Sequence, residues 1–419
     1  DGMLHCFDVL TGQERWAFIP YNLLPKLKNM WAVEPATGIR YFLRDDYVDG
    51  TPVIEDVYID ADGNGSKEWI TILICGQARG KGSTIGGGLN YYFALNITDP
   101  ENPQPLWEFT DNTMGETWSE PAIGRIDKQG GEASGTWVAF VGSGYDNDPN
   151  DVVGNTFYAI DLESGTKFWS FSDSGVNTIT QHGFTWDIAN TFPGSPSIVD
   201  TDQDGNTERV YVGDLDGRIW KIDVSAIFTG ADSWSAVKLY EDSRNYPILS
   251  KPEVWMKPGV VGAAPRIYFG TGGDDIAPSN ATYSFIALTD AATPEVEWFI
   301  GDAAVLGLPA AKKTGVFEAG EKVWADPQVA NYIVYFSTLK GNIESVDPCE
   351  NVLGIGKLYA RYVQAVAGSA LGETALTIGS EKKASIELAI KTRAAVTLGE
   401  RQRTTGGSRK REVYIQEYD

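Results

Sequence analysis

The sequence lacks the features that mark membrane proteins and nucleic-acid-binding proteins. No apolar run reaches the roughly 18 residues that a membrane-spanning helix requires, and we expect no membrane span. Lysine and arginine number 34 against 57 aspartate and glutamate residues, which gives a formal net charge of −23. Because such a chain repels a phosphate backbone, we expect no nucleic-acid partner. The same acidity suits cation binding or an extracellular protein, and it also favours solubility.

Residues that serve redox and catalytic chemistry are scarce as well. The three cysteines, Cys6, Cys75 and Cys349, show no CxxC spacing, so the sequence supports neither a zinc site nor a redox motif. One disulfide is possible, and the sequence does not say which pair would form it. The two histidines, His5 and His182, are interpreted as structural residues. No GxSxG motif is present and no Ser-His-Asp constellation is evident, so we expect the protein not to be an enzyme.

No signal peptide is visible at the N-terminus. The first residues, DGMLHCFDVLTG, already read as the middle of a β-unit. We therefore expect the chain to be the C-terminal part of a larger protein.

What the chain has in abundance is a repeated β pattern, and its 13 Trp and 46 Gly residues favour sheets and turns. One motif is a short apolar stretch, an Asp or similar residue, a turn, and then a Trp beside an aromatic or apolar residue. Its copies are LHCFDVLTGQERWAF from Leu4, YYFALNITDPENPQPLWEF from Tyr91 and TFYAIDLESGTKFWSF from Thr156, with weaker copies from Gly217, Tyr283 and Lys357. The repeated Trp16, Trp107, Trp169 and Trp298 are interpreted as packing residues between repeats.

A second motif places a proline two residues before a Val, Ile or similar residue. Its five copies contain Pro52, Pro121, Pro196, Pro252 and Pro327. Each copy is followed by another β-run, such as WITILICG or WVAFVGSG, so each repeat reads as about four short strands. Proline at the start of a strand costs little, because its missing N–H lies outside the hydrogen-bonded ladder.

Four-stranded sheets bury both of their faces when they pack radially around an axis. We therefore expect an all-β fold, a β-propeller of about six to eight blades, with about seven as the expected number. Residues 1–419 are expected to form a single propeller domain, with residues 1–50 as a split first blade and residues 364–419 as ring-closing strands. A tandem of β-sandwiches is the alternative, but it does not explain why both motifs recur in register.

Residues 200–208, DTDQDGNTE, form an acidic loop between the β-runs SPSIV and RVYVG. Acids at loop positions 1, 3, 5 and 9 and a glycine at position 6 can converge on one hard cation, since Ca²⁺ takes six to eight oxygen ligands. The candidate ligands are the carboxylates of Asp200, Asp202, Asp204 and Glu208 and the backbone carbonyl of Asn206. Without a cation, four carboxylates in one short loop would repel one another. A solvated Asp-Gly turn is the alternative interpretation.

Residues 60–68, DADGNGSKE, form a second candidate loop in the equivalent place of an earlier repeat. The candidate ligands are Asp60, Asp62, Asn64 and Glu68, with the carbonyl of Ser66. Because Asn replaces one Asp, we expect weaker binding here, and a polar turn is again the alternative. A third acidic loop, YDNDPNDVVG from Tyr145, lacks the glycine and the closing acid, so we expect no metal there.

The motifs together resemble a known family. The segments DGMLHCFDVLTGQERWAFIPYNLLPKL, YFLRDDYVDGTPVIEDVYI, YYFALNITDPENPQPLWEF and SPSIVDTDQDGNTERVYVGDLDGRIWKID resemble the C-terminal propeller of PilY-type proteins, the tip-associated adhesins and biogenesis factors of type IV pili. The resemblance extends to about residue 362. It implies a modified, quinoprotein-like propeller in which a DxDxDxxxD loop binds calcium. That pattern falls on Asp200, Asp202, Asp204 and Glu208, with Glu where the family has Asp.

The resemblance also implies a function and a location. The function is pilus biogenesis, extension and retraction, with twitching motility and surface adhesion, modulated by calcium. The implied partners are minor pilins of the pilus tip complex, and the implied location is the cell surface, reached by export through the periplasm. A host or surface receptor would be bound by an N-terminal region that lies outside this sequence.

Two other functions stay open. Propellers with Trp and Gly repeats also resemble quinone-cofactor dehydrogenases, which need a central pocket with a metal and an Asp base, and often adjacent cysteines. This sequence has no adjacent cysteines, and a quinone absorbance band would favour the enzyme. The other alternative is a structural scaffold without a functional metal, which an unchanged melting temperature on chelation would favour.

Overall fold

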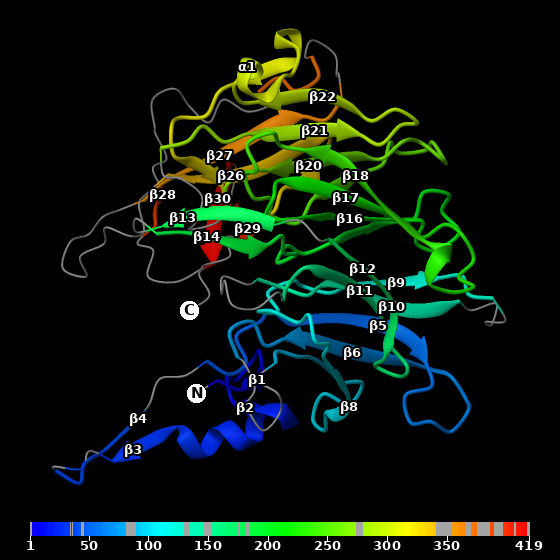
Figure 1. Ribbon diagram of the computed structural model, residues 1–419, viewed down its shortest axis with the longest axis vertical. Coiled ribbons are helices and arrows are strands. Elements are labelled where there is room, and N and C mark those ends of the chain that lie inside the picture. The colour runs from blue at the N-terminus through cyan, green and yellow to red at the C-terminus, as the bar shows by residue number, and fades with distance from the viewer. Residues whose placement is uncertain are drawn as a thin grey trace. The chain divides into compact units, whose positions relative to one another are not determined.

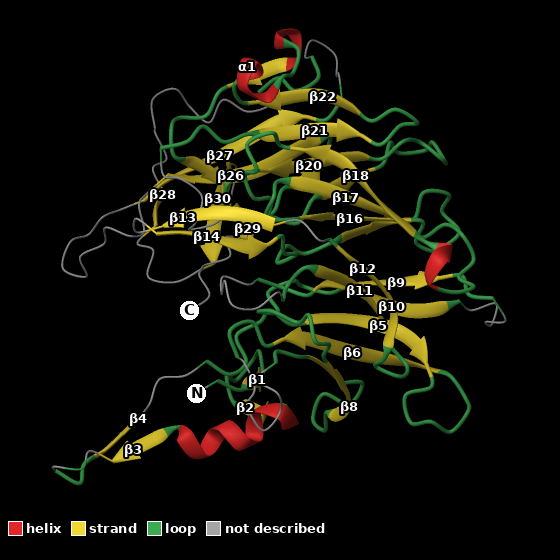
Figure 2. Cartoon of the chain, in the orientation of Figure 1, coloured by secondary structure: helices red, strands yellow, loops and turns green. Residues whose placement is uncertain are grey.

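The computed structural model describes residues 2–33, 35, 37–42, 46–80, 89–129, 135–145, 153–173, 176–181, 184–273, 280–340, 354–364, 370–374, 386–388, 397–405 and 408–416. The chain divides into two compact units. Unit 1 comprises Asp1–Ile267 and Leu288–Glu295, and unit 2 comprises Tyr268–Ala287 and Val296–Asp419. Strands, yellow in Figure 2, form most of the regular structure.

Unit 1 contains three four-stranded antiparallel sheets that follow one another along the chain, coloured from blue to green in Figure 1. The first is β5 (Val53–Ile59), β6 (Glu68–Gly76), β7 (Tyr92–Asn96) and β8 (Gln104–Phe109). The second is β9 (Ala122–Ile126), β10 (Thr136–Gly142), β11 (Thr156–Asp161) and β12 (Lys167–Ser172). The third is β15 (Ser197–Val199), β16 (Arg209–Gly213), β17 (Arg218–Asp223) and β18 (Ser235–Glu241). In each sheet, neighbours in sequence are neighbours in space.

The remaining elements of unit 1 are short. Three antiparallel pairs are β1 (Leu4–Phe7) with β2 (Glu14–Phe18), β3 (Trp31–Val33) with β4 (Arg40–Phe42), and β13 (Val176–Gln181) with β14 (Phe184–Ala189). The 3₁₀ helices are η1 (Tyr21–Asn29) and η3 (Ala231–Ser233), and a further strand is β19 (Glu253–Trp255).

Unit 2 also consists mainly of strands. The unit boundary runs within β20 (Arg266–Gly270), β21 (Phe285–Thr289) and β22 (Glu295–Ile300). The other elements are α1 (Ala303–Leu306), η4 (Ala310–Lys312), β23 (Lys313–Gly315), β24 (Glu321–Val323), β25 (Gln328–Ala330), β26 (Ile333–Lys340), β27 (Gly354–Tyr362), β28 (Ile386–Leu388), β29 (Thr397–Thr405) and β30 (Ser408–Gln416). β26 pairs with β24, β25 and β27, while β29 pairs with β30.

The strand starts that the proline motif predicts are confirmed. Each of the five prolines stands directly before the first residue of a strand, and these strands are β5, β9, β15, β19 and β25. The predicted order of four strands per repeat is confirmed for the three sheets of unit 1. Three elements were not predicted from the sequence: the β13–β14 hairpin, the β3–β4 pair and η1.

Successive sheets of unit 1 bury their faces against each other. One core cluster joins Ile72 and Ile74 of β6 to Val141 of β10 and Ile160 of β11. A second cluster joins Phe140 of β10 to Val212 of β16, through Phe192 in the segment that leads into β15. All of these side chains are fully buried. Since a sheet alone leaves one apolar face in water, this face-to-face burial stabilises the stack.

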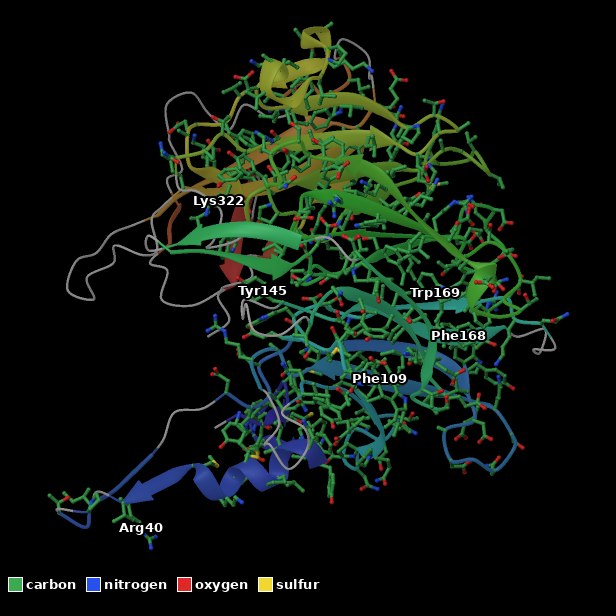
Figure 3. The ribbon with its side chains drawn as sticks, in the orientation of Figure 1. Arg40, Phe109, Tyr145, Phe168, Trp169 and Lys322 are labelled. Atoms are coloured by element: carbon green, nitrogen blue, oxygen red, sulfur yellow. The ribbon has the colours of Figure 1, made fainter. Side chains whose placement is uncertain are left out.

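The repeated tryptophans connect each sheet to the next one. The indole Nε1 of Trp16 on β2 donates to the carbonyl of Pro100 at 2.9 Å. Trp107 on β8 donates to Leu162 at 2.9 Å, and Trp169 on β12, labelled in Figure 3, donates to Ala231 at 3.0 Å. Each acceptor lies in the connection between the third and fourth strands of the following sheet. The interpretation of these residues as packing residues is therefore confirmed for all three.

Glycines at the ends of the second strands allow close approach between neighbouring sheets. A Cβ atom on Gly142 would lie 1.9 Å from the carbonyl oxygen of Phe192, and one on Gly213 would lie 2.3 Å from that of Ile248. The carbonyls of Phe192 and Ile248 both belong to segments that lead toward the next sheet. Any side chain at these glycines would therefore push adjacent sheets apart.

Two further expectations concern helices and cysteines. Within the described ranges, no helix combines the length and the apolar character that crossing a membrane demands. Cys6 is half-buried and Cys75 is buried, and both are free thiols, while Cys349 and His182 lie outside the described residues.

The Trp contacts predict a measurable contribution to stability. Replacing Trp107 by Phe removes the hydrogen bond to Leu162 and should lower the free energy of unfolding by about 1–2 kcal/mol, measured by urea denaturation. Trp69→Phe is the matched control, because Trp69 is 63% exposed and has no hydrogen bond from its indole among the described residues. Equal stabilities of the two variants would contradict a role for the indole bond.

Candidate metal centre

The 200–208 loop connects β15 to β16, the first two strands of the third sheet, as predicted. The 60–68 loop occupies the same place between β5 and β6 of the first sheet. Both loops therefore leave an edge strand and return along its antiparallel neighbour. The repeat thus places them at equivalent positions in their sheets.

The structure brings four of the predicted ligands together in the 200–208 loop. One carboxylate oxygen from each of Asp200, Asp202, Asp204 and Glu208 lies within 4.8 Å of the others. Two oxygens on opposite sides of a Ca²⁺ ion, each about 2.4 Å from it, would be about 4.8 Å apart. The four oxygens are thus close enough to surround one ion, and hard oxygen donors are the ligands that such a cation prefers.

Backbone N–H groups hold the aspartates in this arrangement. The Asp200 carboxylate accepts hydrogen bonds from Gln203 N at 2.5 Å and from Gly205 N at 2.7 Å. Asp202 accepts from Asp204 N, and Asp204 accepts from Asn206 N at 2.7 Å. The tight curl requires positive φ angles of +66° at Gln203 and +89° at Gly205, and glycine adopts such an angle without strain.

Glu208 completes the cluster from the start of the following strand. Its carboxylate accepts from the Thr201 backbone N at 2.5 Å and from Thr201 Oγ1 at 3.1 Å. Only 9% of the residue is exposed. Burial raises the pKa of this carboxyl, and the charges of Asp202 and Asp200 add to the rise, while the bonds from Thr201 oppose it. A nearby cation would offset both the burial and the repulsion.

Asn206 is held by the neighbouring sheet. Its Oδ1 accepts from Arg125 Nε on β9 at 2.7 Å, and its Nδ2 donates to Asp127 Oδ1 at 3.3 Å. Arg125 Nη2 also donates to the carbonyl of Asp204 at 3.1 Å. With the side chain of Asn206 engaged, its backbone carbonyl is the atom left for the predicted ligand role.

The second candidate loop is curled in a similar way but does not gather its acids. Asp60 accepts from the backbone N of Asn64 and Gly65, and Ser66 N donates to Asn64 Oδ1 at 2.8 Å. Glu68 is exposed. In the described part of the chain, groups of three or more metal-ligating side chains meet only in the 200–208 loop. A second ion site in the 60–68 loop stays a prediction. The loop after Tyr145 lies outside the described residues.

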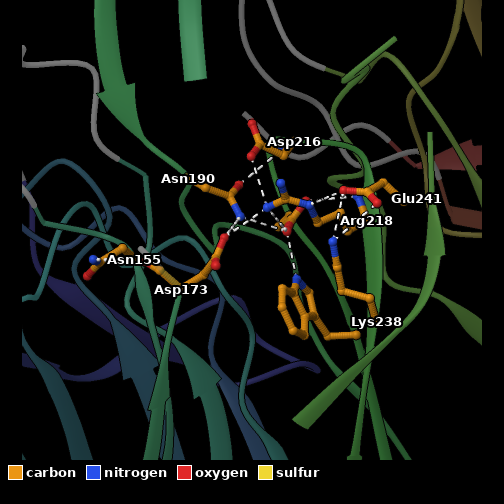
Figure 4. Close-up of polar contacts among 9 residues, drawn as sticks. Asn155, Asp173, Asn190, Asp216, Arg218, Lys238 and Glu241 are labelled. Carbon is orange, nitrogen blue, oxygen red and sulfur yellow. Dashed lines mark hydrogen bonds and ion pairs between the residues drawn. The ribbon is translucent and has the colours of Figure 1, made fainter. Parts of the chain in front are cut away.

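A different acidic cluster, shown in Figure 4, surrounds Arg218 on β17. Arg218 Nη1 lies 2.8 Å from Asp173 and 2.9 Å from Asp216, and its Nε lies 2.9 Å from Glu241. Asp214, which is fully buried, accepts from Trp220 Nε1 and Asn190 Nδ2, both at 2.7 Å. Burial raises the pKa of Asp214 to about 6, against the opposing effect of these donors.

The two clusters differ in how their charge is compensated. An arginine sits among the acids in the Arg218 cluster. No lysine or arginine of the described residues forms an ion pair with the four acids of the 200–208 loop. The guanidinium of Arg125 contacts the Asp204 carbonyl and the Asn206 amide, and that of Arg209 contacts the Glu208 carbonyl and Asp223. The 200–208 loop is therefore the one of the two clusters whose carboxylates face no internal cation among the described residues.

Two residues that shape this loop, Arg125 and Thr201, were not predicted from the sequence. Thr201 lies inside the motif, and a hydroxyl beside the first Asp was the available signal. Arg125 is 75 residues before Asp200 (200 − 125) in the chain, and nothing in its local sequence links it to the loop.

Comparison with known proteins identifies relatives of this chain. The family model described as the PilY1 beta-propeller domain matches residues 1–238. A protein of Pseudomonas aeruginosa named type IV pilus biogenesis factor PilY1 is 33% identical over 227 residues, which cover 54% of this chain and 16% of that protein. A PilY1 homolog of Xylella fastidiosa is 30% identical over 286 residues, covering 65% of this chain and 19% of its own length. The match thus spans less than a fifth of either relative.

Among solved structures, the crystal structure of the Pseudomonas aeruginosa PilY1 C-terminal domain superposes with a TM-score of 0.59 at 19% sequence identity. The alignment covers 99% of this chain and 91% of that one. The all-β propeller fold class is thereby confirmed. The number of blades and a single ring through both units stay predictions.

Repulsion among the four acids predicts that removing one charge stabilises the metal-free protein. With chelator present, Asp202→Asn should raise the free energy of unfolding by about 0.5 kcal/mol, because the amide oxygen can still accept from Asp204 N. The gain should shrink as salt screens the charges. Asp62→Asn in the 60–68 loop is the matched control and should show no gain. A loss of stability in Asp202→Asn would mean that the acids do not repel one another significantly.

Proposed function

This chain belongs to the PilY1 β-propeller family, and from that membership we propose that it is a calcium-binding propeller domain acting in type IV pilus biogenesis. The proposed ligands are Asp200, Asp202, Asp204, Glu208 and the carbonyl of Asn206. The observation that carries the proposal is the convergence of four carboxylate oxygens within 4.8 Å and the lack of any paired cation for them among the described residues. The names of the curated relatives support the role in the pilus.

Ca²⁺ is the proposed ion because of the donor set and the flexibility of the site. All of the available ligands are oxygens, which excludes the nitrogen and sulfur sites that zinc prefers. Mg²⁺ would demand near-octahedral geometry and keep most of its water, whereas Ca²⁺ accepts irregular shells of six to eight oxygens. Two of the acids, Asp202 and Asp204, are exposed, so water can supply the remaining ligands.

Binding of the ion would convert a repelling acidic loop into a rigid surface. We propose that this change regulates contacts with minor pilins of the pilus tip and, through them, extension, retraction and twitching motility. Surface adhesion, a location at the cell surface and export through the periplasm belong to the same proposal. No catalytic role is proposed. A metal-independent scaffold is the competing function, and a quinone-dependent dehydrogenase is the other.

Calorimetric titration with Ca²⁺ tests the ion site. The wild-type protein should bind one ion at this loop, and Asp204→Ala should bind much more weakly while the propeller stays folded, because one carboxylate and its charge are lost. The matched control is Asp62→Ala, which should leave the affinity for this ion unchanged. Equal binding by wild type and Asp204→Ala would refute the assignment of the ligands.

Thermal unfolding separates the calcium-binding protein from the scaffold. At a Ca²⁺ concentration a hundredfold above the dissociation constant, the free energy of unfolding should rise by about 2.7 kcal/mol, because the ion binds the folded state only. Addition of chelator should reverse the rise. A melting temperature that does not respond to either treatment would favour the scaffold.

A further inference from the structure

We propose that strand β9 of the preceding sheet orients the ligands of the ion site, with Arg125 as the positioning residue. In this arrangement, ion binding and the docking of two neighbouring sheets stabilise each other. The inference rests on the proposed function, because it concerns the same ion. It extends that function by naming the contact that the ion would stabilise, which is the docking of the 200–208 loop on β9.

The first support is the set of hydrogen bonds from β9 to the loop. Arg125 donates through Nε to Asn206 Oδ1 at 2.7 Å and through Nη2 to the Asp204 carbonyl at 3.1 Å. Its own carbonyl accepts from Thr207 N at 2.7 Å. One residue of β9 therefore holds three residues of the loop, Asp204, Asn206 and Thr207.

The second support is the direction of these bonds. In the loop, the backbone N–H groups of Asp204, Gly205 and Asn206 point inward to carboxylates. The carbonyl of Asp204 points outward to Arg125. The guanidinium thus holds the outer side of the curl and leaves the inward carboxylates available, so it orients the ligands without replacing the ion.

The third support is the close fit between β9 and the loop. A Cβ atom on Gly124 would lie 2.5 Å from Thr207 Oγ1, and one on Gly205 would lie 2.5 Å from Arg125 Nη2. Both glycines are therefore needed for the contact at its present distance. A methyl group at Gly124 would act as a wedge that moves the loop without altering any charge or ligand.

The junction continues beyond Arg125 and links the two sheets. Asp127, which follows β9, accepts from Asn206 through its side chain, and its carbonyl accepts from Phe228 N at 2.9 Å. Phe228 belongs to the connection between β17 and β18 of the third sheet. Fixing the loop therefore also fixes how the second sheet meets the third at this end.

Thermodynamic linkage converts this geometry into a test. If the ion favours the loop conformation that docks on β9, then docking and ion binding strengthen each other by the same coupling free energy. A change that undoes the docking must therefore weaken ion binding. Gly124→Ala should raise the Ca²⁺ dissociation constant about tenfold, equivalent to about 1.4 kcal/mol. Calorimetry with Ca²⁺ alone as the probe measures this change.

Arg125→Gln is the second variant, and the sign of its effect is informative. Loss of the positive charge on its own would strengthen binding of a divalent cation, whereas loss of positioning would weaken it. We expect weaker binding, by about three- to tenfold, when wild type and variant are compared at the same high salt, where charge effects are screened. Arg15→Gln is the matched control, because it removes an equivalent charge from β2, where Arg15 pairs with Asp8 and Glu101.

A purely structural role of β9 is separated from positioning by two further measurements. Trp107→Phe loosens a different pair of sheets and should lower stability while leaving the Ca²⁺ affinity unchanged. In the wild type, Ca²⁺ should slow hydrogen exchange at the Thr207 and Phe228 amides, and Gly124→Ala should lose this effect at Thr207.

The outcomes distinguish this inference from the proposed function. Wild-type binding with unchanged affinity in both Gly124→Ala and Arg125→Gln would overturn the inference and leave the ion site standing. No Ca²⁺ binding by the wild type would overturn both. Weaker binding in both variants, with normal binding in Arg15→Gln and Trp107→Phe, supports the role of β9.

Discussion

Apolar side chains buried between successive sheets stack unit 1, and a hydrogen bond from a tryptophan of one sheet to a backbone carbonyl of the next fixes how each pair meets. Trp16, Trp107 and Trp169 each end a sheet and each reach the same connection of the following one. The indole ring supplies apolar area, and its N–H satisfies a carbonyl that would otherwise lose water on burial. A directional bond at the outer edge and glycine contacts at the ends of the second strands together fix the spacing of adjacent sheets. That spacing is what brings β9 within hydrogen-bonding distance of the 200–208 loop.

The two acidic clusters of the third sheet contain similar residues but differ in how their negative charge is compensated. Around Arg218, the negative charges face an internal cation, so the group is a self-contained part of the fold. In the 200–208 loop, Arg125 is directed at a carbonyl and an amide, and the carboxylates face one another. Acidic residues alone do not define an ion site in a protein of net charge −23. The feature that distinguishes the 200–208 loop is that its carboxylates converge while no lysine or arginine of the described residues pairs with them.

Much of the sheet order could be predicted from the sequence, because proline before the first strands and tryptophan in the last strands of the first two sheets are local signals that repeat. The convergence of the four acids in the 200–208 loop was also predictable, since they lie within nine residues of the sequence. The difference between the two loops was not. Both have acids at positions 1 and 9, yet Glu208 is drawn inward by Thr201, where the 60–68 loop has Ala61, which lacks a hydroxyl. Arg125 was not predicted because its partners in the loop are distant in sequence. The β13–β14 hairpin was not predicted because it interrupts the repeat.

Strand β16 constrains how an ion in the loop can act on the rest of the protein. Glu208 directly precedes this strand and Asp214 directly follows it, so a single run from Arg209 to Gly213 separates the two acidic clusters. Its central residues are fully buried, and its far end is fixed by the hydrogen bonds of Asp214. A short strand held at both faces and at one end has little freedom to shift when the loop changes. The 200–208 loop moves more easily relative to β9, across the glycines and Arg125, because that junction consists of a few hydrogen bonds on a partly exposed surface. The effect of an ion should therefore appear between sheets rather than along the strand.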